Sequence, residues 1–135
     1  MILVDTNVVI DVSTDDSVWA DWSQQQLDAA ARREPLAIND IVYAELCVGY
    51  RRIEEVDELI AKVGLLIDAI PRRALFLAAK AFQRYRRVGG IKTGVLADFF
   101  IGAHAVVADV ALITRDPTRY RSYFPGIELI TPSLN

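Results

Sequence analysis

Hydrophobic and polar positions follow two alternating patterns along this chain. Short apolar runs, bounded by turn formers or helix caps, predict strands at residues 2–5, 36–38, 65–68, 110–114 and 128–130. Between them, apolar residues recur with helical spacing and predict helices at about residues 7–12, 17–33, 40–50, 54–63, 71–87 and 97–108. Alternating strands and helices are typical of an α/β fold with a parallel sheet, here a short-stranded one. We expect Asn39 or Asp40 to cap the third helix and Pro71 to take the first position of the fifth.

The length and composition predict one domain that spans residues 1–135. The chain is 53% hydrophobic, with a mean hydropathy of +0.24, which provides enough apolar material for a full core. Its apolar runs are far shorter than the roughly 20 residues of a membrane span, and its start lacks a basic segment. We therefore expect a cytoplasmic protein without a membrane segment or a secretion signal.

Sulfur and imidazole ligands are scarce. Cys47 is the single cysteine and His104 the single histidine, which excludes an internal disulfide and His-rich zinc sites. Oxygen ligands remain, and they favour Mg2+ or Mn2+. His104 follows Asp98 by six residues on one predicted helix, so it is turned well away from that acid, and we interpret it as structural or partner-facing.

Charge is unevenly divided along the chain, although the net charge is only -3. Residues 1–70 hold 14 acidic and 5 basic side chains, whereas residues 71–135 hold 4 acidic and 10 basic ones. The basic half, with interleaved tyrosines, could steer phosphates toward nearby acids. The alternative is that the arginines at 84–87 only complement a helix end. The candidate RNA-binding residues are Arg84, Arg86, Arg87, Lys92, Arg115 and Arg119.

Four carboxylates occupy positions with apolar surroundings. Asp5 ends an apolar strand, Glu45 and Asp98 lie in apolar helices, and Asp116 follows an apolar strand. Removing a carboxylate from water costs several kcal/mol unless it is paired or binds a cation. We expect these acids to leave water together around Mg2+.

Each acid also has a simpler interpretation. Asp5 could be a helix N-cap, and Glu45 could extend to water from the edge of its apolar stripe. Asp98 could complement a helix dipole in the first turn, and Asp116 could be an ordinary turn residue before Pro117. The joint occurrence of all four favours the metal site.

Four segments together resemble a known family: residues 2–7, 42–46, 96–105 and 112–116, followed by Tyr120, Tyr123, Phe124 and Pro125. With them the chain is similar to PIN-domain ribonucleases, specifically to VapC toxins of type II toxin-antitoxin systems. The resemblance implies a Rossmann-like, three-layer fold. It also implies that the catalytic and metal-binding residues are Asp5, Glu45, Asp98 and Asp116, around one or two Mg2+ or Mn2+ ions, with Thr6, Asn7 and Thr114 as supports.

The same resemblance implies an activity and partners. The activity would be metal-dependent hydrolysis of phosphodiester bonds in RNA, in loops of tRNA or ribosomal RNA, by a homodimer that a cognate antitoxin silences. A housekeeping RNA-processing nuclease, an aspartyl-nucleophile phosphatase and a noncatalytic RNA-binding module are alternatives. The phosphatase usually needs an acid two residues after the first, where this chain has Asn7. Asp11 and Asp109 also lie near the motifs, which leaves a fifth carboxylate open.

Overall fold

One parallel sheet organises the fold. The computed structural model describes residues 1–92 and 94–133, and its strands follow the order β3-β2-β1-β4-β5, with every neighbouring pair parallel. The strands are β1 (Ile2–Val4), β2 (Leu36–Ile38), β3 (Leu65–Ile67), β4 (Ala111–Ile113) and β5 (Leu129–Ile130). The predicted short-stranded parallel sheet is confirmed, and several strands end one residue earlier than predicted.

Six of the helices match the predicted ones within a few residues. The helices are α1 (Thr6–Ser13), α2 (Ala20–Ala31), α3 (Asp40–Cys47), α4 (Ile53–Val63), α5 (Arg72–Arg87), α6 (Leu96–Ala108) and α7 (Thr118–Tyr123). Helix α7 was not predicted, because it is short and polar and buries only Tyr120. Helix α2 begins three residues later than expected, since the Asp16 carboxylate accepts hydrogen bonds from the backbone of Val18 and Trp19 and holds a turn there.

Local capping explains several helix boundaries. Asn39 caps α3, because its Oδ1 accepts from the backbone N–H groups of Ile41 and Val42. Pro71 is extended and serves as the N-cap of α5, one position before the predicted one. Gly64 ends α4 with a φ of 83°, a left-handed conformation that favours glycine.

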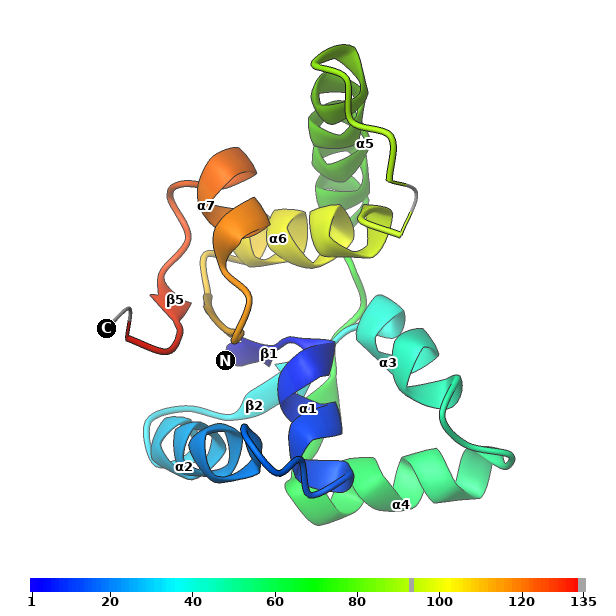
Figure 1. Ribbon diagram of the computed structural model, residues 1–135, viewed down its shortest axis with the longest axis vertical. Coiled ribbons are helices and arrows are strands. Elements are labelled where there is room, and N and C mark those ends of the chain that lie inside the picture. The colour runs from blue at the N-terminus through cyan, green and yellow to red at the C-terminus, as the bar shows by residue number, and fades with distance from the viewer. Residues whose placement is uncertain (93, 134–135) are drawn as a thin grey trace.

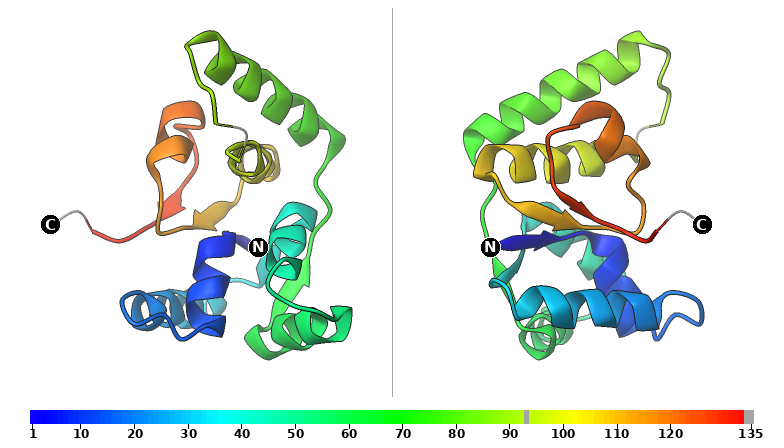
Figure 2. Two further views of the ribbon diagram at one scale, coloured as in Figure 1. Left: turned by 45° about the vertical axis from the view of Figure 1, so that its right-hand side comes forward. Right: turned by 90° about the vertical axis from the view of Figure 1, so that its left-hand side faces the viewer.

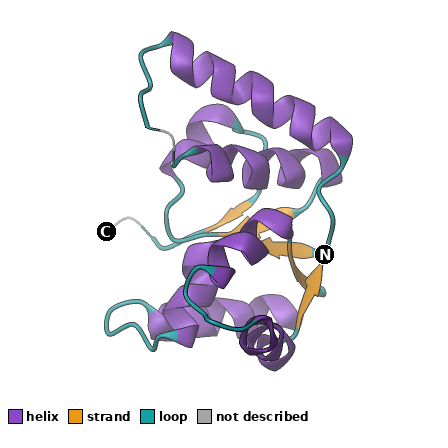
Figure 3. Ribbon diagram, turned by 90° about the vertical axis from the view of Figure 1, so that its right-hand side faces the viewer, coloured by secondary structure: helices purple, strands orange, loops and turns teal. Residues whose placement is uncertain are grey.

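Helices cover both faces of the sheet. Helices α5, α6 and α7 lie on one side, and α1, α2 and α4 lie on the other (Figures 1 and 2). Figure 3 shows the strands between these two helical layers. Strands β1, β2 and β4 are fully buried, as expected for parallel strands covered on both faces. Among the described residues, no helix is long and apolar enough to cross a membrane.

The strand order places a crevice at the carboxyl ends of β1 and β4. The chain first moves from β1 to β2 and β3 on one side, and then returns to β4 and β5 on the other. In parallel α/β sheets, ligands bind outside the carboxyl ends of strands where the order reverses in this way. Helix α3 contacts both α1 and α6 and therefore brings its side chains toward this crevice.

Candidate active site

The four predicted acids line one cavity of about 270 Å³ at this crevice. Asp5 directly follows β1, Asp116 follows β4, and Glu45 and Asp98 come from α3 and α6. The structure thus brings together side chains from distant parts of the chain. The other lining residues are Thr6, Asn7, Ile10 and Arg115.

Asp5 is buried at the base of the cavity, with 5% of its surface exposed. Its Oδ2 accepts hydrogen bonds from the Thr114 hydroxyl at 2.8 Å and the Tyr120 hydroxyl at 2.9 Å. Its Oδ1 accepts from the Thr6 backbone at 2.7 Å, so Asp5 also caps α1. The pKa of Asp5 is raised from 3.8 to about 6, chiefly by burial and to a smaller extent by the nearby Asp98, although these hydrogen bonds act to lower it.

The three predicted supporting residues connect the acids. The Thr6 hydroxyl donates to Glu45 Oε1 at 2.6 Å and so joins α1 to α3. The Asn7 side-chain amide donates to Asp5 Oδ2 at 3.4 Å and to Thr114 Oγ1 at 3.3 Å. Thr114 Oγ1 in turn accepts from the Asp116 backbone N–H at 3.1 Å. These bonds orient the Asp5 and Glu45 carboxylates and hold the backbone of Asp116 beside Thr114.

The acids differ in exposure, which corrects the expectation that all four leave water. Only Asp5 is buried; Glu45 is partly buried, 33% of the Asp98 side chain is exposed, and Asp116 is exposed. Asp116 lies on the loop between β4 and α7 and lines the cavity from an exposed position. Its position in the cavity, rather than its burial, is what relates it to the other acids.

Asp98 is paired with a cation from α7. Arg119 Nη1 donates to Asp98 Oδ2 at 2.8 Å. The pKa of Asp98 is nevertheless raised, because desolvation and the nearby Glu45 and Asp116 outweigh the effect of Arg119. Glu45 and Asp116 therefore oppose ionisation of Asp98, as Asp98 opposes ionisation of Asp5.

Two observations test whether this site suits a divalent cation. The donors are carboxylate oxygens, and the partners that hydrogen-bond the buried Asp5 are all neutral, so its charge lacks a direct counter-ion. Over residues 1–92 and 94–133, however, no three Asp, Glu, His or Cys side chains are already placed to hold a metal ion. The residues fit Mg2+ or Mn2+ in chemistry, and side-chain movement is needed to form the coordination group.

Two buried residues beside the site have contacts that the sequence analysis did not predict. Tyr120, which is 1% exposed, was named in the family resemblance without a role, and its hydroxyl donates a hydrogen bond to Asp5 Oδ2. Asp11, also 1% exposed, accepts from Arg115 Nε at 2.8 Å and from the Ser23 hydroxyl at 2.9 Å. The apolar neighbours of Asp11 on α1 could have indicated its burial. Neither Asp11 nor Asp109 lines the acid cavity, so neither is placed as a fifth carboxylate there.

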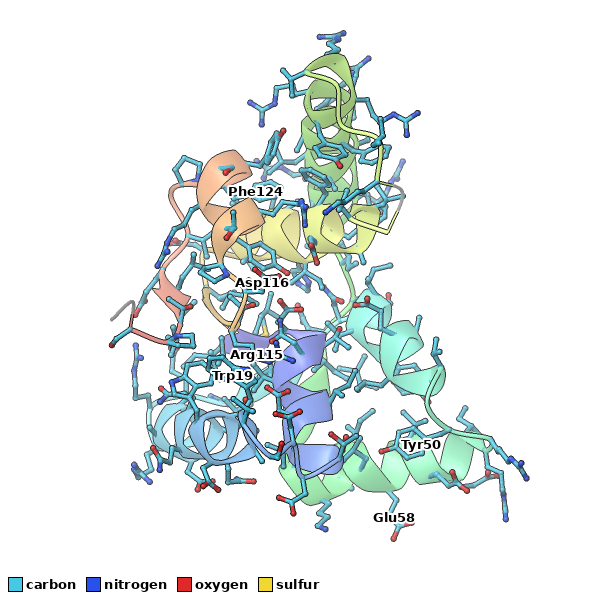
Figure 4. All side chains as sticks on the ribbon, in the orientation of Figure 1. Trp19, Tyr50, Glu58, Arg115, Asp116 and Phe124 are labelled. Carbon is cyan, nitrogen blue, oxygen red and sulfur yellow. The ribbon has the colours of Figure 1, made fainter. Side chains whose placement is uncertain are left out.

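The six predicted RNA-binding cations do not form one group. Arg115 lines the acid cavity, and its guanidinium lies 5.6 Å from the Trp19 ring (Figure 4). Arg119 reaches Asp98, and Arg84 lies 5.8 Å from the ring of Tyr123. Of the six, only Arg115 lines the acid cavity. The remaining cations are Arg86, which lies over the Phe82 ring, and the exposed Arg87 and Lys92.

His104 faces away from the acids, as the helical spacing predicted. It is fully buried, its Nε2 lies 2.8 Å from Asp68 Oδ2, and its Nδ1 lies 3.2 Å from Asn39 Nδ2. Because the Asn39 amide nitrogen can only donate, Nδ1 accepts and Nε2 carries the proton toward Asp68. The imidazole therefore ties α6 to the start of α3 and to the end of β3.

The chain belongs to the PIN domain family, whose model matches residues 2–123. It is similar in structure to VapBC2 from Rickettsia felis bound to a promoter DNA fragment, with a TM-score of 0.74, 21% identity and coverage of 97% and 98% of the two chains. It is also similar to a toxin-antitoxin complex from Klebsiella pneumoniae, with a TM-score of 0.71, 25% identity and 98% coverage of both chains. A search of curated proteins gave no match. The PIN-domain membership expected from the sequence is confirmed.

Proposed function

We propose that this protein is the toxin of a toxin-antitoxin pair and acts as an Mg2+- or Mn2+-dependent endoribonuclease. The observation that carries the proposal is the convergence of Asp5, Glu45, Asp98 and Asp116 on one cavity. Membership of the PIN domain family supports a nuclease, and the near-complete coverage of toxin-antitoxin structures supports the toxin role. Loops of tRNA or ribosomal RNA are the proposed substrates.

The four acids would hold one or two divalent ions. When bound, such an ion would supply Lewis-acid chemistry, that is, a lower pKa for a water molecule and neutralisation of phosphate charge. Thr114 and Tyr120 hold the Asp5 carboxylate in one orientation by donating to its Oδ2. One carboxylate takes the proton of the attacking water, and the geometry favours no particular one. The 2′-hydroxyl of RNA is not required in this reaction.

Arg115 is placed to orient the phosphate. Its Nε is held by Asp11, and its backbone N–H donates to Asn7 Oδ1 at 3.3 Å, so the residue is anchored at two points beside the acids. The hydrogen bond to Asp11 raises the pKa of Arg115, which keeps the guanidinium charged. An anchored guanidinium can bind phosphate oxygens with little loss of side-chain freedom.

An antitoxin is the proposed partner, because the similar structures include complexes of toxin and antitoxin. We propose that it covers the acids with an inserted segment, and that the toxin works in the cytoplasm as a homodimer. A small reading frame next to this gene that encodes a DNA-binding protein would separate a toxin from a housekeeping nuclease. Co-expression of the two proteins would test the pair directly, since the neighbour should neutralise the toxicity of this protein.

An RNA cleavage assay in Mg2+, Mn2+ and EDTA tests the activity. We expect cleavage with either metal, none in EDTA, and a loss of at least about 100-fold in Asp98→Asn, since a carboxylate would be removed from the metal site. Asp109→Asn is the matched control, because Asp109 ends the same helix outside the cavity and asparagine tolerates its left-handed conformation. Activity that survives EDTA, or the double substitution Asp5→Asn and Asp98→Asn, would overturn the metal-dependent mechanism.

The phosphatase alternative is weakened by Asn7. This side chain stands where a second acid would be needed, and it is bound to Thr114 and to the Arg115 backbone. Trapping of a phosphorylated Asp5 would revive that alternative. RNA binding that is indifferent to chelator, without cleavage, would instead indicate a noncatalytic module.

A further inference from the structure

A second cavity, of about 230 Å³, adjoins the acid cavity, and Asp116 lines both. It lies between the C-terminal part of α5 and helix α7. Its lining residues are Tyr85, Asp116, Thr118, Arg119, Ser122 and Tyr123. None of the functions described above uses this cavity.

The chemistry of the second cavity suits a nucleobase. Tyr85 and Tyr123 are both partly exposed, and their ring centroids lie 6.3 Å apart with the planes at 76°. The Arg119 guanidinium lies 5.9 Å from the Tyr85 ring centroid, and the hydroxyl groups of Thr118 and Ser122 complete the wall. Aromatic rings and arginine planes stack on the bases of single-stranded RNA, while hydroxyls and carboxylates bind base edges.

The aromatic walls are held in place by the fold. A Cβ at Gly90 would lie 2.4 Å from the Tyr85 ring, so the backbone at residue 90 packs directly against that ring. The Tyr85 hydroxyl also accepts a hydrogen bond from the Lys92 backbone at 3.1 Å. The Tyr123 ring lies 5.0 Å from the buried Phe99. Rigid walls reduce the entropic cost of binding a base.

Arg119 stands at the boundary of the two cavities. It lines the second cavity and at the same time reaches Asp98 of the first. A nucleotide whose phosphate lies among the acids would therefore have its neighbouring base within reach of the second cavity. We propose that this cavity is the subsite for the base of a nucleotide next to the cleaved phosphate, an inference that rests on the proposed ribonuclease function.

Base removal along a cleaved RNA tests the subsite. Single-stranded oligonucleotides that carry one abasic nucleotide at successive positions are compared with the intact oligonucleotide by kcat/KM. We expect one position beside the cleaved bond at which base removal lowers kcat/KM by about 5- to 150-fold, the value of one base stacked on an aromatic ring. Absence of any sensitive position in the wild-type protein would overturn the proposal.

Two variants assign that sensitivity to this cavity. Ser122→Trp fills the cavity from an exposed position of α7, and Tyr123→Leu removes one aromatic wall. In both we expect intact and abasic oligonucleotides to be cleaved at equal rates, whereas Tyr123→Phe keeps the wild-type ratio. Tyr50→Leu is the matched control, since Tyr50 lies far from Asp116 and lines a different cavity (Figure 4). An unchanged ratio in Ser122→Trp would overturn the proposal.

Failure of the subsite and failure of the nuclease function give different results. If the wild-type protein cleaves RNA but the variants keep its abasic ratio, only the subsite is wrong. If the wild-type protein cleaves no RNA, the nuclease function is wrong, and binding then decides the subsite. The fluorescence of an RNA oligonucleotide that contains 2-aminopurine, measured in EDTA, should be quenched by the wild-type protein and not by Ser122→Trp. Equal fluorescence with the two proteins would overturn the subsite.

Discussion

Arg119 and Asp98 form an ion pair of 2.8 Å at the boundary between the acid cavity and the second cavity. The guanidinium occupies an oxygen, Asp98 Oδ2, that a divalent ion would also seek. Both side chains are partly exposed, at 26% and 33%, so solvent screens the pair and its strength is modest. Arg119 therefore pairs with Asp98 in the metal-free protein and would compete weakly with a divalent ion for this oxygen.

Replacing Arg119 should strengthen metal binding. In Arg119→Gln we expect the dissociation constant for Mn2+ to fall about fivefold in the absence of RNA, because a competing cation worth on the order of 1 kcal/mol is removed. Titration calorimetry or Mn2+ paramagnetic resonance measures this change. Arg121→Gln, an exposed residue of the same helix, is the control. Equal or weaker Mn2+ binding in Arg119→Gln would contradict the competition.

Asp5 should make the metal-free protein less stable as the pH rises from about 4 to 6. Its pKa is raised from 3.8 to about 6 in the folded state, so the folded protein binds the proton more tightly than the unfolded chain. The contribution of Asp5 to the free energy of unfolding is most favourable below the pKa of this group in the unfolded chain. It is lost as the pH rises through the pKa in the folded state and is constant at higher pH. The loss amounts to about 3 kcal/mol.

Urea unfolding in EDTA at several pH values measures this effect as the difference between the wild-type protein and Asp5→Asn. The asparagine side chain does not titrate, so the difference isolates one carboxyl group from the others. Added Mg2+ should restore stability at pH 7, because it binds the ionised carboxylate of the folded state. A difference that does not vary between pH 4 and 6 would show that Asp5 ionises normally.

The fold could be predicted largely because its strands are buried on both faces. Such strands appear as short apolar runs, for example Ile2–Val4, and are visible without tertiary information. Helix α7 lacks this signal, since its alternating arginines and tyrosines show no helical apolar repeat. Its place over the site depends on the packing of Tyr120 and Phe124 against α6.

The meeting of the four acids at one cavity could be predicted, whereas the contacts around them could not. Asp5 and Asp116 could be located because parallel strands end at one edge of the sheet. The bond between Thr6 and Glu45 spans 39 positions and requires α1 and α3 to meet, which no local pattern encodes. The pairing of Arg119 with Asp98 also depends on the unpredicted helix α7.

Cleavage should leave a 5′-phosphate and a 3′-hydroxyl, because water attacks the phosphorus and the 2′-hydroxyl takes no part. Mass spectrometry of the products distinguishes these ends. An oligonucleotide with a single 2′-deoxynucleotide at the cleaved bond should be cut within a fewfold of the all-RNA rate. A 2′,3′-cyclic phosphate, or complete protection by the deoxynucleotide, would contradict hydrolysis by water.

Arg115 should contribute more to stability than Arg119 does. Asp11, its partner, is 1% exposed, and among the described residues Asp11 Oδ1 is a buried oxygen without a hydrogen-bond partner. Arg115→Met would leave this buried carboxylate without a counter-ion, with only the Ser23 hydroxyl donating to it, and cost about 3 kcal/mol, whereas Arg119→Met should cost about 1 kcal/mol or less. Urea unfolding compares the two. The double variant Asp11→Asn and Arg115→Met should recover much of the loss; no recovery would show that the charge of Asp11 is not the cause.

Gly102 allows α7 to approach α6 closely enough for Tyr120 to reach Asp5. A Cβ at this position would lie 2.4 Å from the Phe124 ring and 3.1 Å from the Tyr120 ring. Gly102→Ala gains up to about 1 kcal/mol in helix propensity, but overpacking costs about 1–3 kcal/mol, so we expect a net loss of stability. Displacement of Tyr120 should also weaken Mn2+ binding, because it removes one of the hydrogen bonds that orient Asp5.

Gly126→Ala is the matched control for this substitution, since a Cβ at residue 126 meets nothing within 4 Å. Its unfolding free energy and Mn2+ affinity should equal those of the wild-type protein. Tyr120→Phe separates the two effects of Gly102→Ala, because it removes the hydroxyl that donates to Asp5 while it keeps the ring. We expect Tyr120→Phe to reproduce the weaker Mn2+ binding without most of the loss of packing. If Gly102→Ala binds Mn2+ as tightly as the wild-type protein, the packing of α7 does not set the geometry of Asp5.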